Sequence, residues 1–249
     1  MTHPTLGIVL FARMSSSRLP GKMLARIGPT TLLERVVGRA RLVGVPLLLA
    51  TSTDRTDDAL HEAGEGLGVE VFRGSVDDVL GRACRAARSA GFDGFARLCG
   101  DRPFFPIDDM RRALGVMEES LREGVPCDLV TTRLPRPVPP GLLTEVVRTA
   151  ALEEAHASAT SPDEFEHVTT RFYARPGDYR IHALPTPLQD LVGVALTVDT
   201  ESDRVRIGAL IDACPDIAES AWSAALRARA AAFSFGPVTP AGRQTKGHE

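Results

Sequence analysis

Short apolar segments alternate with amphipathic segments along the first hundred residues, and this alternation restricts the fold more than any other feature. The apolar segments are too short for buried helices, so we predict strands at 6–11, 45–50, 69–72 and 94–99. The intervening segments have helical periodicity or capping residues, which predicts helices at 30–42, 56–66 and 76–90. Strands and helices that alternate in this way form βαβ units. The expected fold class is therefore α/β, with a mostly parallel sheet covered by helices on both faces.

The segments beyond residue 100 continue this pattern less regularly. We predict strands at 128–131, 179–184 and 193–198. We predict helices at 107–123, at 142–157, opening at 163–169, following 199–203 to about 213, and at 216–232. Four prolines within 133–141 forbid a helix and indicate an ordered loop. Few large apolar residues follow residue 235, so we expect a domain over 1–235 and a flexible tail over 236–249.

A cationic loop follows the first predicted strand. Arg13, Arg18 and Lys22 lie within ten residues, beside the serines at 15–17, and Pro20-Gly21 forces a turn. Arginine forks, a lysine charge and hydroxyls at the carboxyl end of an inner strand suit a polyphosphate. The segment lacks the G-x-x-x-x-G-K-[ST] pattern, which disfavours a P-loop kinase or ATPase. A solvated basic loop that only caps a strand is the alternative.

Two distant carboxylates occupy equivalent positions. Asp101 and Asp199 are each the first carboxylate after an apolar predicted strand. Ligands of parallel sheets bind beyond the carboxyl ends of the strands, where the loop, the 51–54 segment and Asp101 should meet. Two such carboxylates opposite a cationic loop suit Mg²⁺ carried by a nucleoside triphosphate, and hence phosphoryl or nucleotidyl transfer. Taken singly, Asp101 could be a turn residue and Asp199 a helix cap.

Composition excludes several other classes of protein. The chain has 249 residues, 43% of them hydrophobic, enough for an ordinary packed core. A formal net charge of −3 and a pI near 6.1 argue against a general nucleic-acid binder. No apolar run could span a bilayer and the amino terminus lacks a secretory pattern, so we expect a cytoplasmic protein. The cysteines are widely spaced, and we expect reduced core residues at Cys84, Cys99, Cys127 and Cys214.

Segment 12–22, A-R-M-S-S-S-R-L-P-G-K, resembles the A-R-x-x-S-x-R-L-P-x-K signature of cytidylyltransferases that activate 2-keto sugar acids. These are the acylneuraminate and 3-deoxy-manno-octulosonate enzymes, and the resemblance is strongest to the spore coat polysaccharide biosynthesis protein F branch. Further matches follow in order at 50–53, 71–80, 100–103, 166–169 and 196–200. The resemblance implies a three-layer, single-domain fold of the nucleotide-diphosphosugar-transferase type. It also implies a homodimer that transfers CMP from CTP to an acidic acceptor and releases pyrophosphate.

The resemblance carries over to individual residues. It implies triphosphate contacts by Arg13, Ser16, Arg18 and Lys22, and Mg²⁺ binding by Asp101 and Asp199. It implies catalytic roles for Arg13, Lys22 and Asp101, an approach to the base by Thr51 and Ser52, and acceptor contacts by Arg73, Asp77, Glu145 and His167.

Two departures from the branch concern the acceptor side. Leu143 replaces an aspartate of the G-L-D-x-E-V pattern, and Phe165 replaces the arginine of R-E-H-V. A nucleotide-binding homologue without turnover is therefore one rival interpretation. The other is a glycosyltransferase of similar fold that uses a nucleotide-sugar donor, although no D-x-D follows Asp101 or Asp199. The sequence does not identify the acceptor.

Overall fold

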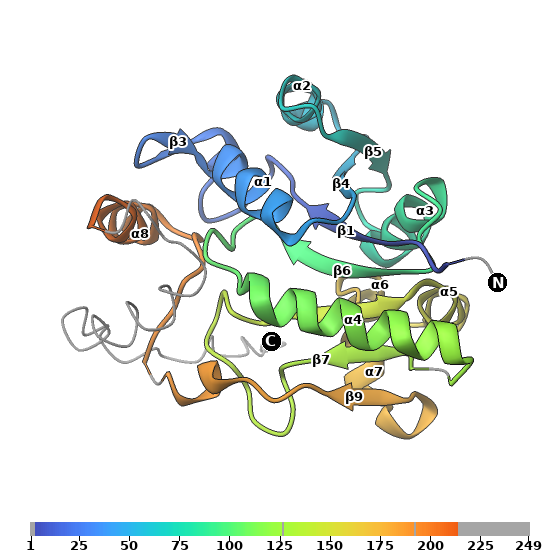
Figure 1. Ribbon diagram of the computed structural model, residues 1–249. Helices are drawn as coiled ribbons and strands as arrows, with labels where there is room; N and C mark the ends of the chain where they lie inside the picture. Colours follow the sequence, from blue (N-terminus) through green and yellow to red (C-terminus); the bar gives the residue numbers. More distant parts are fainter. Residues whose placement is uncertain (1–2, 126, 192, 214–249) are drawn as a thin grey trace, which may run out of the picture.

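Seven strands form one mixed sheet in the order β5-β4-β1-β6-β8-β7-β9 (Figure 1). The computed structural model describes residues 3–125, 127–191 and 193–213. Neighbouring strands pair in parallel among β5 (Glu70–Gly74), β4 (Leu47–Ser52), β1 (Leu6–Phe11) and β6 (Gly94–Cys99). Antiparallel β8 (Glu145–Arg148) joins β6 to β7 (Leu129–Thr131), which pairs in parallel with β9 (Ile181–Ala183). The predicted α/β fold with a mostly parallel sheet is confirmed as a single domain.

Helices cover both faces of the sheet. One face carries α1 (Leu32–Val43) and α4 (Ile107–Glu123), and the other carries α3 (Val79–Ser89) and α5 (Thr149–Ala157) (Figure 1). The other helices of the described residues are α2 (Asp58–Gly66), α6 (Pro162–Glu166), α7 (Thr170–Ala174), α8 (Glu201–Ala213) and the 3-10 turns η1 (Lys22–Leu24), η2 (Arg55–Asp57), η3 (Pro176–Asp178) and η4 (Pro187–Asp190). A hairpin of β2 (Arg26–Ile27) and β3 (Thr30–Thr31) contacts α8. Each face therefore has its own hydrophobic core.

Local capping explains where two helices begin. Thr31 and Glu34 form a reciprocal capping box at the start of α1, as the threonines at 30–31 predict. The predicted start of α3 is wrong, because Asp77 and Asp78 precede the helix instead of occupying its first turn. The Asp78 carboxylate accepts a hydrogen bond of 2.7 Å from the Gly81 amide. Asp78 is thus the N-cap, and the chain at 75–77 remains a loop.

The helix predicted at 142–157 is wrong in its first part. Residues 145–148 form β8 between β6 and β7, and only the later residues form α5. Val146 and Val147 are fully buried in the middle of the sheet. Side chains of this β-branched pair pack well on a pleated surface, and pairing on both edges outweighs the helical propensity of the flanking residues.

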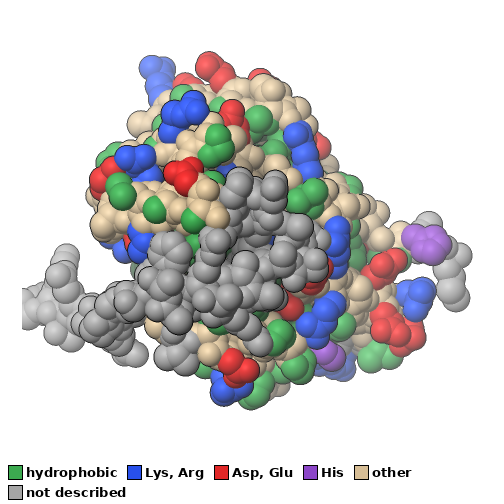
Figure 2. All heavy atoms as spheres, turned by 60° about the vertical axis from the view of Figure 1, so that its left-hand side comes forward, with side chains coloured by type: hydrophobic (Ala, Val, Ile, Leu, Met, Phe, Trp, Pro, Cys, Tyr) green, Lys and Arg blue, Asp and Glu red, His purple; other side chains and the backbone are tan. Residues whose placement is uncertain are grey.

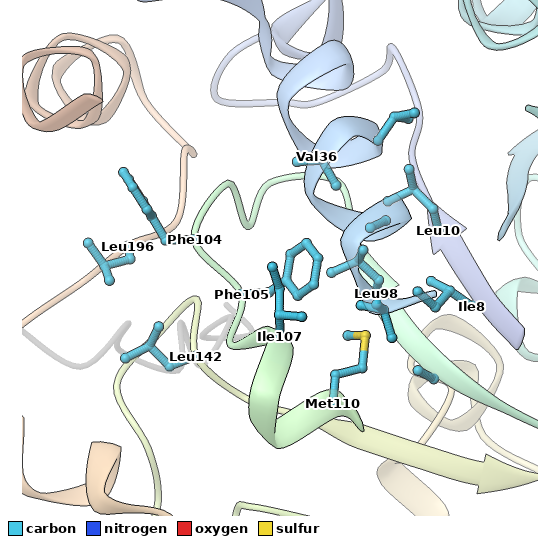
Figure 3. Packing of buried hydrophobic residues seen from close by; sticks show 14 of the residues in the cluster. Ile8, Leu10, Val36, Leu98, Phe104, Phe105, Ile107, Met110, Leu142 and Leu196 are labelled. Atoms are coloured by element: carbon cyan, nitrogen blue, oxygen red, sulfur yellow. The ribbon is translucent and has the colours of Figure 1, made fainter. Parts of the chain in front are cut away.

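The strand predicted at 193–198 is also wrong. The segment is extended, with Val194, Leu196 and Val198 buried, but it pairs with loops and forms no ladder. The Leu196 amide donates to the Pro140 carbonyl at 2.8 Å, and the Val198 amide donates to the Asp101 carbonyl at 2.9 Å. In Figure 3, Leu196 lies beside Phe104, close to Leu142. The alternation of apolar and other residues that predicted a strand therefore reflects the burial of one side of this segment.

The remaining sequence expectations concern the surface, the cysteines and the carboxyl end. Lys and Arg side chains are interspersed with acidic ones over the face seen in Figure 2. Cys84, Cys99 and Cys127 are free thiols, and burial raises the pKa of Cys84 to about 12. Cys214, the helix predicted at 216–232 and the tail predicted at 236–249 lie outside the described residues. Within 3–125, 127–191 and 193–213, no helix is long and apolar enough to cross a membrane.

Candidate active site

The cationic loop after β1 is held in place by one buried carboxylate. Asp57, at the end of η2, is 1% exposed. Its Oδ1 accepts a hydrogen bond of 2.6 Å from the Met14 amide, and its Oδ2 accepts one of 3.1 Å from the Ser52 amide. The Ser52 hydroxyl donates to the same Oδ2. Asp57 therefore fixes the loop to the carboxyl end of β4.

Two glycines let the loop approach the next strand end. Gly21 has a φ of 73°, and its amide closes the loop by donating to the Met14 carbonyl at 2.9 Å. A side chain at Gly100 would place its Cβ 2.6 Å from the Cε of the buried Met23 in η1, so glycine at this position lets the chain after β6 pass close to η1 without displacing that methionine. This close approach brings Lys22 beside Asp101.

Lys22 lies between the two predicted metal ligands. Its Nζ is 3.0 Å from Asp199 Oδ1 and 3.7 Å from Asp101 Oδ2, with the lysine side chain 11% exposed. The same Nζ donates to the Val198 carbonyl at 2.8 Å. Arg18 reaches the same Asp199 oxygen at 3.1 Å from the solvent side. The two acids, distant in sequence, thus share one edge with the cationic loop.

The donor set at this edge fits a hard cation carried by a polyphosphate. Asp101 Oδ1 is buried and has no hydrogen-bond partner among the described residues, although its other oxygen contacts Lys22. Mg²⁺ in nucleotide enzymes is commonly held by one or two carboxylates, with phosphate oxygens and water completing the shell. Asp101 and Asp199 supply such carboxylates. In the described part of the chain, no group of three or more His, Cys, Asp and Glu side chains could hold a metal ion by itself.

These side chains open into a cavity of about 390 Å³. Most of the predicted nucleotide and metal residues line it together: Arg13, Ser16, Arg18, Lys22, Asp101 and Asp199. His167, predicted for the acceptor, lines it as well, next to Glu166. Glu166 Oε1 is 3.3 Å from an Arg13 guanidinium nitrogen in a largely exposed pair. The cavity therefore has a carboxylate-lysine end and an Arg13-Glu166 end.

Four other predicted residues do not reach this cavity. Thr51 and Ser52 are buried and do not line it, and Ser52 is hydrogen-bonded to Asp57. Arg73 instead donates from Nε to the Ser52 carbonyl at 2.9 Å and pairs with Asp58 at 2.6 Å. Asp77 is exposed and lines a second cavity. Arg73 is thus placed to support the 52–54 loop.

Glu145, predicted to contact the acceptor, is instead a buried support. It is 1% exposed, and its Oε2 accepts from Arg97 at 2.7 Å. Its Oε1 accepts from Tyr173 at 2.7 Å and from Thr169 at 3.0 Å. Burial raises the pKa of Glu145, but the Arg97 charge and the two hydroxyls outweigh it and hold that pKa below its ordinary value. An ionised Glu145 therefore fixes the side chain of Arg97, which lines the cavity.

Sequence reasoning missed three charged residues of this site. Arg97 and Arg82 line the cavity, and Asp57 anchors the loop. Arg97 lies inside a predicted strand, and Arg82 and Asp57 lie inside predicted helices, where charged residues are usually assigned to solvent. A charge in the middle of an otherwise apolar inner strand, G-F-A-R-L-C, is the signal that could have found Arg97.

The fold and the pairing of a cationic loop with two converging carboxylates define a nucleotidyltransferase. Residues 6–212 match the family model described as cytidylyltransferase. The chain belongs to the cytidylyltransferase family.

Two relatives agree with this assignment, and a solved structure shares the fold. The spore coat polysaccharide biosynthesis protein SpsF of Bacillus subtilis (strain 168) is 31% identical over 224 residues, which cover 85% of this chain and 90% of the relative. The 3-deoxy-manno-octulosonate cytidylyltransferase of Xanthomonas euvesicatoria pv. vesicatoria (strain 85-10) is 31% identical over 116 residues, 45% of each chain. The structure of a cytidylyltransferase from Leptospira borgpetersenii serovar Hardjo-bovis (strain JB197) has a TM-score of 0.83 and 24% identity, covering 96% of this chain and 100% of that one.

Proposed function

We propose that this chain transfers CMP from CTP to an acidic sugar, or a related acceptor, and releases pyrophosphate. The observation that supports the proposal most is the meeting of Lys22, Asp101 and Asp199 at one cavity that the cationic loop also lines. CTP as the donor and a sugar acid as the acceptor follow from the family and from the names of the relatives.

The chain's own residues suggest how the reaction proceeds. The acceptor oxygen attacks the α-phosphorus, the bond from that phosphorus to the bridging oxygen breaks, and the acceptor proton is lost to solvent. Lys22 and Arg18 lie at the carboxylate end of the cavity, where their charges balance those of the departing pyrophosphate. Arg13 lies at the other end, toward Glu166 and His167. The acceptor therefore enters from the Glu166 side.

The same proposal includes Mg²⁺, with Asp101 and Asp199 as its protein ligands. When bound, the ion supplies neutralising charge to phosphate oxygens. Before the ion binds, the positive charge of Lys22 offsets the negative charges of the two carboxylates and holds them in position. Homodimer formation and a cytoplasmic location are also proposed from the family resemblance. Light scattering of the purified chain tests the first.

A pyrophosphate-release assay tests the activity and the donor together. Each of the four nucleoside triphosphates is combined with Mg²⁺ and a mixed pool of sialic-type, octulosonate-type and phosphonate acceptors. We expect release with CTP and loss of release when EDTA removes the metal. Release of a nucleoside diphosphate from a nucleotide sugar would instead indicate a glycosyltransferase. Calorimetric binding of CTP with no turnover on any acceptor would indicate a non-catalytic homologue.

A further inference from the structure

Arg82 is a buried arginine that lines the cavity without a paired carboxylate. The residue, on α3, is 3% exposed. One guanidinium N–H donates to the Ser75 carbonyl. The Nε is buried and has no hydrogen-bond partner, and no carboxylate forms a salt bridge with Arg82, among the residues that the structure describes. Burial, and next the charge of Arg13, lower the pKa of Arg82.

Two other buried arginines of the chain are paired with carboxylates, and a third lies over an aromatic ring. Arg97 pairs with Glu145 at 2.7 Å, and Arg171 pairs with Glu164 at 2.6 Å. Arg39, which is 7% exposed on α1, donates to the Phe105 carbonyl at 3.0 Å and lies over the Phe105 ring. A buried guanidinium remains charged in proteins, and burying a charge is costly unless it is paired. Arg82 therefore leaves a deficit of negative charge inside the cavity.

The position of Arg82 indicates which part of the cavity has this deficit. The charged groups that act most strongly on it are Arg13, Asp57, Glu166 and Asp78. Ser75, which accepts its hydrogen bond, lines a second cavity of about 670 Å³ that shares Glu166 with the first. Arg82 thus belongs to the Arg13-Glu166 end of the first cavity, and its acceptor Ser75 borders the second.

We propose that the Arg82 guanidinium binds a substrate oxyanion at this end of the cavity, and that the oxyanion is the acid group of the acceptor. The inference rests on the proposed function and adds the residue that recognises the acceptor charge. The acceptor is favoured over the triphosphate because Lys22 and Arg18 lie at the opposite end, beside Asp199. A phosphate of the nucleotide has the same oxyanion chemistry and is the other source that the experiment must distinguish.

The experiment compares Arg82→Met and Arg82→Lys with Arg39→Lys, a buried arginine outside both cavities. Circular dichroism and Tm establish that each variant is folded. The KM is measured for a sugar acid that the wild type converts and for its methyl ester, and calorimetry gives the Kd for CTP. We expect Arg82→Met to raise the KM of the acid at least about tenfold, from the loss of a charged hydrogen bond, and to leave the ester and CTP unchanged. Arg82→Lys should recover part of the loss, whereas Arg39→Lys should not change KM.

Each outcome decides the inference. A rise in the acceptor KM alone supports it as stated, whereas a rise of similar size in the CTP Kd supports the oxyanion site with the nucleotide as the source. Unchanged values for both substrates in a folded Arg82→Met variant overturn it. If the wild type converts no acceptor, the proposed function fails. Calorimetry with CTP and inorganic phosphate then decides, because weaker binding in Arg82→Met supports the site and equal or absent binding refutes it.

Discussion

The two ends of the cavity differ in how the chain builds them. At the carboxylate-lysine end, the side chains come from loops after inner parallel strands and from the extended segment that meets them. On the segment that carries Glu166, at the Arg13-Glu166 end, charges take part in buried pairs: Thr169 donates to Glu145, which holds Arg97, and Arg171 pairs with Glu164. The first end presents charges to a ligand. The second uses charges largely to fix other side chains, so a charged residue there is more often a support than a contact.

The largest expected effect comes from the carboxylate-lysine end. Asp101→Asn and Asp199→Asn each remove a charge that would face the metal, so we expect pyrophosphate release to fall by about 10³-fold or more. Tm should change little, because neither carboxylate is needed in the core. Pyrophosphate-release kinetics with a thermal melt measure both. Turnover at the wild-type level from either variant would contradict the metal assignment.

The second expected effect is on stability, at the opposite end. Glu145→Gln leaves the Arg97 charge buried and unpaired, so we expect about 3 kcal/mol less free energy of unfolding, measured by urea denaturation. Glu153→Gln is the matched control, because Glu153 pairs with Arg88, which is 71% exposed, and should cost less than about 1 kcal/mol. Equal costs for the two variants would show that Glu145 is not a support.

A third effect sharpens the contrast between contact and anchor. Asp57→Asn turns an acceptor toward the Ser52 amide into a donor, so the loop loses an attachment without losing a cation. We expect the KM for CTP to rise about tenfold, with a smaller change in kcat. The control Asp54→Asn alters an exposed cap in the same segment and should change neither constant. An unchanged KM in Asp57→Asn would mean that the loop is held by other contacts.

The smallest effect is a pH dependence near Glu164. Backbone amides, first that of Thr160, and Arg171 lower the pKa of this carboxyl to about 2. A lowered folded-state pKa stabilises the protein above the ordinary carboxyl pKa of about 4.3, and this stabilisation is lost as the pH falls toward 2. Glu164→Gln should therefore melt earlier than wild type at pH 7, with the difference narrowing at pH 3. A constant difference in Tm across this range would contradict the assignment.

The difference between local and long-range contacts explains how much of the fold and the site could be predicted from the sequence. The parallel strands, their helices and the meeting of Lys22 with Asp101 follow from local patterns, because each strand and the loop after it are adjacent in the chain. Asp199 reaches the same edge although the strand predicted before it does not form. The errors at 142–157 and 193–198 arise where pairing with distant segments decides the conformation. The role of Glu145 could not be predicted either, since a support and a contact have the same sequence signature.

The hydrogen bond from the Val198 amide to the Asp101 carbonyl also has a consequence for synthesis. The cationic loop leaves the ribosome early, but the acid next to Val198 emerges only after every strand of the sheet has been made. A nascent chain that ends before this bond has Arg18, Lys22 and Asp101 but lacks Asp199. The cationic loop and Asp199 are therefore brought together only after every strand of the sheet has been translated.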